Sequence, residues 1–201
     1  PGHYYEQGFD LRLWPERLAY PLRWKKPRRI FVNSMSDLFH QEVPDEYIIK
    51  VLETMQQANW HTYQVLTKRP SRLRRWIPQL SAVLGAKWPR HIWFGVSVET
   101  AQYEWRVDEL RKVPSPIRFV SAEPLLGPLT TINLTDVHWL IVGGESGRDN
   151  RPCSVEWVRQ LRDLCAQRSV AFFFKQWGGR THSSGGRLLD GRTWDEYPVV
   201  D

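Results

Sequence analysis

Residues 91–123, HIWFGVSVETAQYEWRVDELRKVPSPIRFVSAE, decide the fold that we predict for this chain. Two short runs rich in β-branched and aromatic residues, 91–97 and 117–121, are typical of strands. The stretch between them is amphipathic and starts at Thr100, a residue type that caps helices, so we expect a helix from there to about Lys112. Strand, helix and strand in this order make one repeat of a parallel sheet.

The same alternation continues in both directions along the chain. Further strands are predicted at 29–33, 62–66, 138–142 and 170–174, and further helices from Pro44, around 72–76 and from Ser154. The sequence therefore predicts an α/β protein: a partial (β/α) barrel of about six parallel strands. We expect a single domain over residues 1–201, with an irregular C-terminal tail over 178–201 that covers the barrel or hangs loosely.

Composition restricts the class of protein. The chain has 201 residues, 41% hydrophobic and 25% charged, which is typical of one globular domain with a real core. No apolar run approaches the roughly 20 residues that cross a membrane, and no signal peptide opens the chain. Cys153 and Cys165 are the only cysteines, so a secreted disulfide framework is excluded. We expect a cytoplasmic protein with no membrane partner.

The charge balance favours an anionic partner. The formal net charge is +6 and the isoelectric point about 9.5, which suits a nucleic acid, a nucleotide or a phosphorylated substrate. Basic residues form two runs: Lys25, Lys26, Arg28 and Arg29, and then Lys68, Arg69, Arg72, Arg74 and Arg75. The alternative is a solvated basic surface. Eleven tryptophans, some beside arginines, would also suit stacking on bases.

Polar residues follow each predicted strand. The segments are Asn33-Ser-Met-Ser-Asp37, Thr67-Lys-Arg69, Ser97-Val-Glu99, Ser121-Ala-Glu123-Pro124, Gly143-Gly-Glu145-Ser-Gly147 and Lys175-Gln-Trp177. In a β/α barrel the carboxyl ends of the strands converge on one mouth, where such enzymes carry out their chemistry. Alternatively, these residues only mark where strands emerge into solvent. That explanation accounts less well for three strands that end in Glu.

These segments supply the candidate site residues. We predict catalytic roles for Glu123, Glu145, Lys68 and Lys175. The two glutamates, with Asp37, would accept hydrogen bonds from an amine or from ribose hydroxyls. Lys68, Arg69 and Lys175 would bind a carboxylate or phosphate. A Schiff-base role for Lys68 or Lys175 would require a desolvated lysine, and nothing in the sequence indicates that either one is desolvated.

Two glycines, one histidine and two cysteines need separate treatment. Gly143 and Gly144 would let the backbone approach a ligand, although a tight turn alone could explain them. We interpret His40 as structural rather than as a ligand or base. Cys153 and Cys165 are not interpreted as a metal pair, so no metal ligand is predicted in these residues.

Seven segments in order from Pro21 into the tail carry a resemblance to a known family. They are PLRWKKPRRIFVNSMSDLFHQEVP, QVLTKRP, FGVSVE, RFVSAEPLLGP, WLIVGGESG, FFFKQWG and LLDGRTWDEYP. By these the chain resembles a phage and prophage family of largely unassigned function, the "gene product thirty-seven / sixty-eight" family. SMSDLFH and VGGESG are its most specific segments.

The resemblance implies radical S-adenosylmethionine chemistry. Members usually begin with a loop whose three cysteines hold a [4Fe–4S] cluster, which reduces S-adenosylmethionine to a 5′-deoxyadenosyl radical. Residues 1–20 contain no cysteine, so the 201 residues alone cannot assemble that cluster. Either the cysteine loop lies upstream of Pro1 or this protein has lost it. Because the chain opens on Pro1 in what reads as the middle of a loop, we expect the first, with the barrel N-terminally incomplete.

Cofactor-binding residues are implied by strand order in the same family. Asn33, Ser34, Ser36 and Asp37 would bind the methionine amino group. Ser97, Glu99, Ser121 and Glu123 would face ribose or methionine. Gly143, Gly144 and Glu145 would lie near the adenine or the methionine carboxylate.

Three functions remain open at this stage. The first is a radical S-adenosylmethionine enzyme that modifies nucleic acid or a nucleotide, inactive as the 201 residues alone. The second is a cluster-free barrel hydrolase or lyase with Glu123 and Glu145 as its acid–base pair. The third is a non-enzymatic, basic, tryptophan-rich protein that binds nucleic acid or a phage partner.

Overall fold

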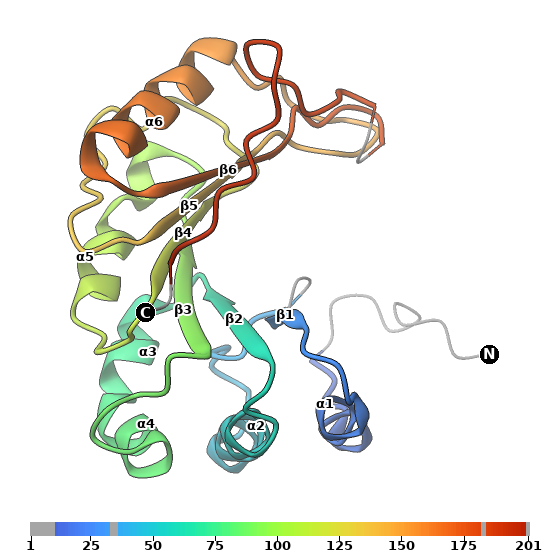
Figure 1. The fold of residues 1–201 in the computed structure, drawn as a ribbon, viewed down its shortest axis with the longest axis vertical. Coiled ribbons are helices and arrows are strands. Elements are labelled where there is room, and N and C mark those ends of the chain that lie inside the picture. The colour runs from blue at the N-terminus through green and yellow to red at the C-terminus, as the bar shows by residue number, and fades with distance from the viewer. Residues whose placement is uncertain (1–10, 33–35, 182–183, 200–201) are drawn as a thin grey trace.

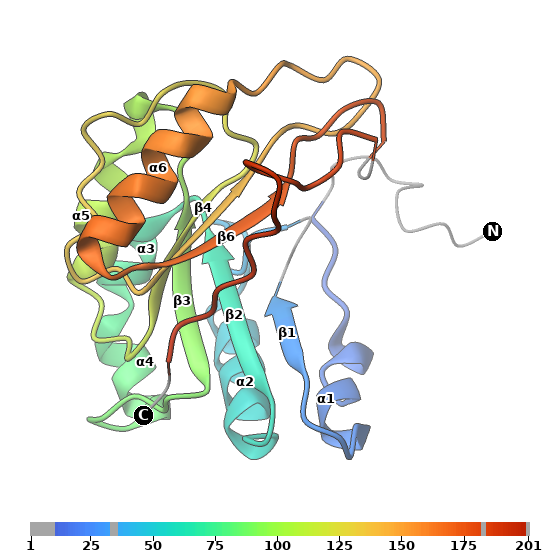
Figure 2. The same cartoon turned by 45° about the horizontal axis from the view of Figure 1, so that its top comes forward.

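A single curled sheet organises the molecule in the computed structural model, which describes residues 11–32, 36–181 and 184–199. Its strands are β1 (Arg29–Val32), β2 (Thr62–Thr67), β3 (Ile92–Ser97), β4 (Arg118–Ala122), β5 (Trp139–Gly143) and β6 (Ala171–Gln176). They are all parallel and stand side by side in chain order. The sheet forms a half-barrel, as Figures 1 and 2 show, which confirms the predicted fold class.

Helices connect the strands and cover the outer face of the half-barrel (Figure 1). They are η1 (Pro15–Arg17), α1 (Tyr20–Arg23), α2 (Asp45–Gln57), α3 (Pro70–Arg75), α4 (Ile77–Leu84), η2 (Ala101–Tyr103), α5 (Trp105–Arg111) and α6 (Val155–Arg168). Helices lie in every crossover between neighbouring strands except that from β4 to β5, which residues 123–138 span without a helix. None of the described helices is long and apolar enough to cross a bilayer.

Most predicted elements lie within a few residues of their expected bounds, but two helices differ. The helix expected around 72–76 is two short helices that meet at Trp76, because Pro78 in the first turn of α4 has no N–H to continue a helix from α3. The helix expected from Thr100 opens with a 3₁₀ turn, and the Thr100 side chain makes no capping hydrogen bond. Neither η1 nor α1 was predicted.

The two faces of the sheet are packed differently. Outward-facing side chains such as Val65, Phe94 and Leu140 join the helices in the main hydrophobic core. The inner face carries a second cluster of Trp93, Ile117, Phe119, Trp139 and Ile141. Gly95 makes this cluster possible, because a Cβ there would lie 2.5 Å from the Phe119 ring.

The C-terminal tail covers the inner face. It runs antiparallel beside β6, where the Phe174 N–H donates to the Trp194 carbonyl at 2.9 Å. The ring of Tyr197 then packs on the inner cluster, 5.0 Å from the Trp139 ring between centroids. On its other side the Arg29 guanidinium lies 3.8 Å from the Tyr197 ring centre. The tail thus joins the last strand to the first across the open side of the half-barrel.

Candidate functional site

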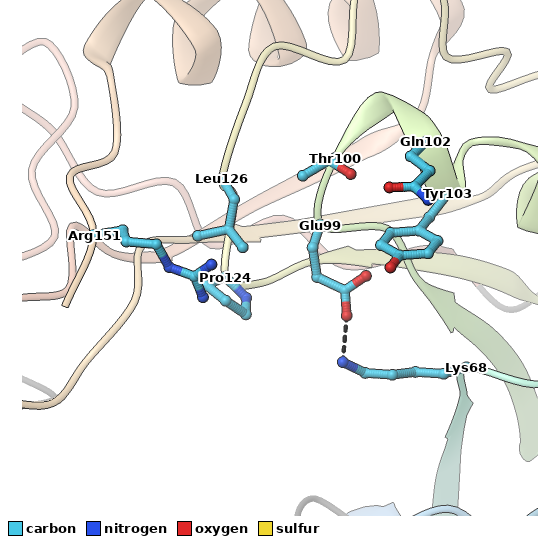
Figure 3. Close-up of a pocket in the computed structure, with 8 residues that line it drawn as sticks. All are labelled: Lys68, Glu99, Thr100, Gln102, Tyr103, Pro124, Leu126 and Arg151. Atoms are coloured by element: carbon cyan, nitrogen blue, oxygen red, sulfur yellow. Dashed lines mark ion pairs between the residues drawn. The ribbon is translucent and has the colours of Figure 1, made fainter. Parts of the chain in front are cut away.

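A cleft lies at the carboxyl edge of the sheet, between the loops that follow β2, β3, β4 and β5. Its volume is about 340 Å³, within the range of small-ligand sites. It is lined by Lys68, Glu99, Thr100, Gln102, Tyr103, Pro124, Leu126 and Arg151. In Figure 3, Lys68 and Glu99 lie on one side with Tyr103, and Arg151 reaches in from the other past Pro124 and Leu126. The predicted convergence at the carboxyl ends therefore occurs for Lys68 and Glu99.

Glu99 is the buried charge of this cleft, with 6% of the residue exposed. One carboxylate oxygen pairs with the Lys68 ammonium, and the other lies 3.1 Å from Nη1 of Arg106. The same Nη1 donates to the Ser97 carbonyl at 2.9 Å, and the guanidinium lies 4.0 Å from the Tyr103 ring centre. Two cations, one of which also donates a hydrogen bond, compensate the desolvation of a single carboxylate.

Asp37 ties the loop after β1 to the end of β2. Its Oδ1 accepts from the Phe39 N–H at 2.9 Å and the Thr67 hydroxyl at 2.7 Å. Its Oδ2 accepts from the Lys68 N–H at 3.0 Å and from Arg69 Nη1 at 2.9 Å. All four bonds are internal, so Asp37 holds Lys68 in place and has little capacity left for a methionine amino group.

The other residues of that segment contribute less. Ser36 is exposed. Asn33 and Ser34 lie outside the described residues. His40 caps a short turn, since its N–H donates to the Asp37 carbonyl at 2.9 Å and its carbonyl accepts from Arg72. The His40 ring itself accepts from the Glu42 N–H at 3.4 Å, and its structural interpretation stays a prediction.

Glu123 and Lys175 form a second charged pair, from the ends of β4 and β6. The Lys175 ammonium lies 2.8 Å from Oε1 of Glu123 and 3.1 Å from Oε2. The pair spans the end of β5, and a Cβ on Gly143 would lie 3.2 Å from Cγ of Glu123. Gly143 therefore gives Glu123 room to reach Lys175. The ammonium is more than half exposed and paired, so it does not resemble a desolvated Schiff-base lysine.

Ser97 and Ser121 lie next to each other in the sheet register. Both are buried, at 2% and 3% exposure. By strand alternation they share the inner face with Phe119 and Glu123. The structure therefore brings the predicted site residues together as two groups, one in the cleft and one on the inner face.

Glu145 is bound firmly by Arg151. The guanidinium donates to both carboxylate oxygens, at 2.8 Å from Nε and 2.6 Å from Nη2, and the Arg151 N–H donates at 2.8 Å. Mainly through these hydrogen bonds, Arg151 lowers the pKa of Glu145 to about 2. At neutral pH the carboxylate is ionised and serves to aim Arg151 into the cleft.

The glycines of the 143–147 turn serve backbone packing. A Cβ on Gly144 would lie 1.9 Å from the Trp177 carbonyl oxygen, and one on Gly178 would lie 2.1 Å from that of Glu145. Gly144 N–H donates to the Gln176 carbonyl at 2.8 Å, and Gly179 N–H to the Glu145 carbonyl at 2.9 Å. On this side Gly144 faces the 177–179 segment, not a ligand as we predicted, because two backbones meet there in direct contact.

Sequence reasoning missed Arg106 and Arg151. Arg106 lies seven residues after Glu99, within the predicted helix, and only the burial of both side chains reveals their pairing. Arg151 follows the glycine-rich turn in a loop with no motif of its own. Nothing in the sequence pattern indicated Gln102 or Tyr103 either. The signal that could have found Arg106 is the need of a buried Glu99 for cationic partners, whereas no such signal points to Arg151, because Glu145 is only partly buried.

No metal centre is formed by the described residues. They contain no group of three His, Cys, Asp or Glu side chains that could hold an ion. Burial raises the pKa of the Cys153 thiol to about 11 and that of Cys165 to about 12, so both stay protonated at neutral pH. The described residues therefore do not fit the three-thiolate site of a [4Fe–4S] cluster.

Fold and cleft together define an α/β half-barrel protein with a charged cleft at the carboxyl edge of its parallel sheet. More particularly, the chain belongs to the family of proteins of unknown function DUF5131, whose family model matches residues 3–198. Comparisons with curated protein sequences and with solved structures give no match.

Proposed function

We propose that this chain is the half-barrel domain of an S-adenosylmethionine-dependent enzyme of phage or prophage origin. The observation that carries the proposal is the charge pattern of the cleft: Lys68 and Arg151 as cations and Glu99 as a carboxylate, around about 340 Å³. An amino-acid zwitterion presents the complementary charges within one small group. The resemblance of seven segments supplies the identity of the ligand and the phage setting.

Five of the eight residues that line the cleft have a role in this proposal. Lys68 and Arg151 bind the α-carboxylate of the ligand through charge-assisted hydrogen bonds. Glu99, whose position is fixed by Arg106, accepts from the α-ammonium group. The Tyr103 ring and Leu126 offer an apolar wall for the thioether carbons or the adenine.

Radical chemistry is the finer part of the proposal, and it comes from the resemblance alone. A reduced [4Fe–4S] cluster supplies the electron for this chemistry. The described residues do not hold such a cluster, so we assign no step of the reaction to it. The half-barrel residues bind and orient the ligand.

Ligand binding is tested by calorimetric titration of the chain with S-adenosylmethionine and with 5′-methylthioadenosine, which lacks the amino-acid group. We expect Lys68→Met and Arg151→Met each to weaken S-adenosylmethionine binding on the order of 10-fold. Lys112→Met is the matched control, because Lys112 is an equally exposed lysine in an ion pair and is not among the residues that line the cleft. Equal affinity for both ligands, or no binding of either, would reject the proposal.

The radical part is tested on the gene product purified without oxygen. About four irons per chain and 5′-deoxyadenosine on addition of S-adenosylmethionine and a reductant would support it. A protein that binds S-adenosylmethionine but takes up no iron on anaerobic reconstitution would reject the radical part and leave the binding proposal standing.

A cluster-free hydrolase that uses Glu123 and Glu145 as acid and base is not favoured by the geometry. A general acid must be protonated near neutral pH, whereas Arg151 lowers the pKa of Glu145 to about 2. Glu123 forms an ion pair with Lys175.

A further inference from the structure

The positive charge of the chain is concentrated beside β1. Residues 11–29 hold seven basic residues and one acidic residue, Glu16, which gives a formal charge of +6. The whole chain, with 28 basic and 22 acidic residues, also has a formal charge of +6. All other residues therefore balance one another, and the excess lies in this single stretch of 19 residues.

Several cations of this basic segment, residues 11–29, are open to solvent. Arg23, Lys25 and Lys26 are exposed and form no ion pair with any residue that the structure describes. Arg28 is exposed as well, with its guanidinium 4.5 Å from the Trp24 ring centre. Unpaired cations this close together repel one another. A bound polyanion would therefore stabilise these charges more than their contacts within the fold do.

The segment is nevertheless held in one conformation. The Arg28 N–H donates to Nδ1 of His61 at 3.1 Å, so the ring proton is on Nε2, which donates to the Pro21 carbonyl at 2.9 Å. Nε1 of Trp60 donates to the Trp24 carbonyl at 2.7 Å. A surface fixed before binding loses less entropy when a partner arrives.

Exposed aromatic rings lie among these cations. Tyr20 is 43% exposed and Trp60 39% exposed. Trp14 has the guanidinium groups of Arg12 and Arg17 at 4.0 and 4.2 Å from its ring centre. Cations that follow a phosphate backbone, together with rings on which bases stack, are the features that bind single strands without sequence preference.

We propose that residues 11–29, together with Trp60, form a surface that binds single-stranded nucleic acid. The lysines and arginines contact phosphates, and Tyr20 and Trp60 stack on bases. α1, within this segment, lies at the β1 end of the half-barrel, opposite α6 (Figures 1 and 2). The surface belongs to residues other than those of the carboxyl-edge cleft, so it does not depend on the proposed S-adenosylmethionine site.

The test uses a labelled 20-nucleotide oligothymidylate, titrated with the chain at several salt concentrations. For the triple variant K25Q/K26Q/R28Q we expect binding on the order of 10- to 100-fold weaker, and a log–log salt slope about 2 smaller in magnitude. R75Q/K87Q/R168Q is the matched control, because it removes the same charge from exposed residues elsewhere. Circular dichroism and thermal melting verify that both variants fold.

A second variant tests stacking. Tyr20→Ser removes an exposed ring and is expected to weaken single-strand binding about 10-fold, with the affinity for a duplex of equal phosphate number unchanged. K68M/R151M should bind the oligonucleotide as the unmodified chain does, which separates this surface from the cleft.

Three results would overturn the proposal. They are equal losses in the triple variant and its control, binding of duplex or heparin as tight as that of the single strand, and preference for vesicles of anionic lipid. The last two would show a surface that responds to charge alone.

Discussion

Two basic stretches that look alike in sequence differ in the structure in whether their side chains form ion pairs. The first, Lys25 to Arg29, remains unpaired among the described residues apart from ring contacts. In the second, Lys68 pairs with Glu99, Arg69 with Asp37, Arg72 with Asp45 and Arg74 with Glu109. The second stretch therefore stabilises the fold, whereas the first is available to a partner.

Topology explains the difference. The second stretch follows β2, a central strand, so neighbouring loops and helices on both sides bring carboxylates to it. The first precedes β1, an edge strand, with sheet on one side only. A count of charges in sequence is thus no guide to whether they bind something outside the molecule. The position of each stretch in the sheet decides this.

The largest expected effect comes from breaking the paired region at its most buried point. Arg106→Met leaves Glu99 with one cation, and we expect the free energy of unfolding to fall by about 3 kcal/mol in urea titrations. Replacing both partners, in E99M/R106M, should recover part of the loss because no buried charge is left alone. A loss below about 1 kcal/mol in Arg106→Met would contradict the buried pairing.

A smaller effect is expected at the link between β1 and β2. Asp37→Asn keeps the shape but removes the charge that accepts four hydrogen bonds, so we expect a loss of about 2 kcal/mol in the same measurement. Glu42→Gln is the control, since it removes an exposed carboxylate three residues beyond the turn. Equal stability of the two variants would show that Asp37 does not anchor Lys68.

Acid titration sharpens the comparison within the paired region. The pKa of Glu145 is lowered from 4.5 to about 2 in the folded chain. Its ion pair therefore stabilises the fold above pH 4.5, and this contribution is lost as the pH falls from 4.5 towards 2. Carbon-13 NMR of the Glu145 carboxyl should show its titration near pH 2, and near its ordinary value in Arg151→Met. An unchanged titration in that variant would refute the role of Arg151.

The smallest effect is expected in the open region. The double variant K25Q/K26Q should change the free energy of unfolding by less than about 0.5 kcal/mol, because these side chains form no ion pair with a described residue. A clear destabilisation would mean that the first stretch also serves the fold, and the comparison of the two stretches would fail.

The fold was largely predictable because hydrophobic period and helix caps are local signals. All six strands and the carboxyl-edge position of Lys68 and Glu99 follow from them. The partners of each charge were not predictable. Asp37 is satisfied by residues about 30 positions away, and Gly144 is required by a carbonyl at Trp177. Such contacts depend on how segments far apart in the sequence pack together, and the periodicity of hydrophobic residues carries no information about that packing.

The tail also affects how the chain can fold during synthesis. Tyr197 packs against Trp139 and beneath Arg29, a residue 168 positions earlier. A ribosome delivers β1 long before the tail, so the inner face of the half-barrel stays uncovered until the tail has been synthesised. Such distant contacts also slow folding, because the intervening chain must be ordered before they form. The inner aromatic cluster is therefore the surface through which a newly made chain is most open to chaperones and to aggregation.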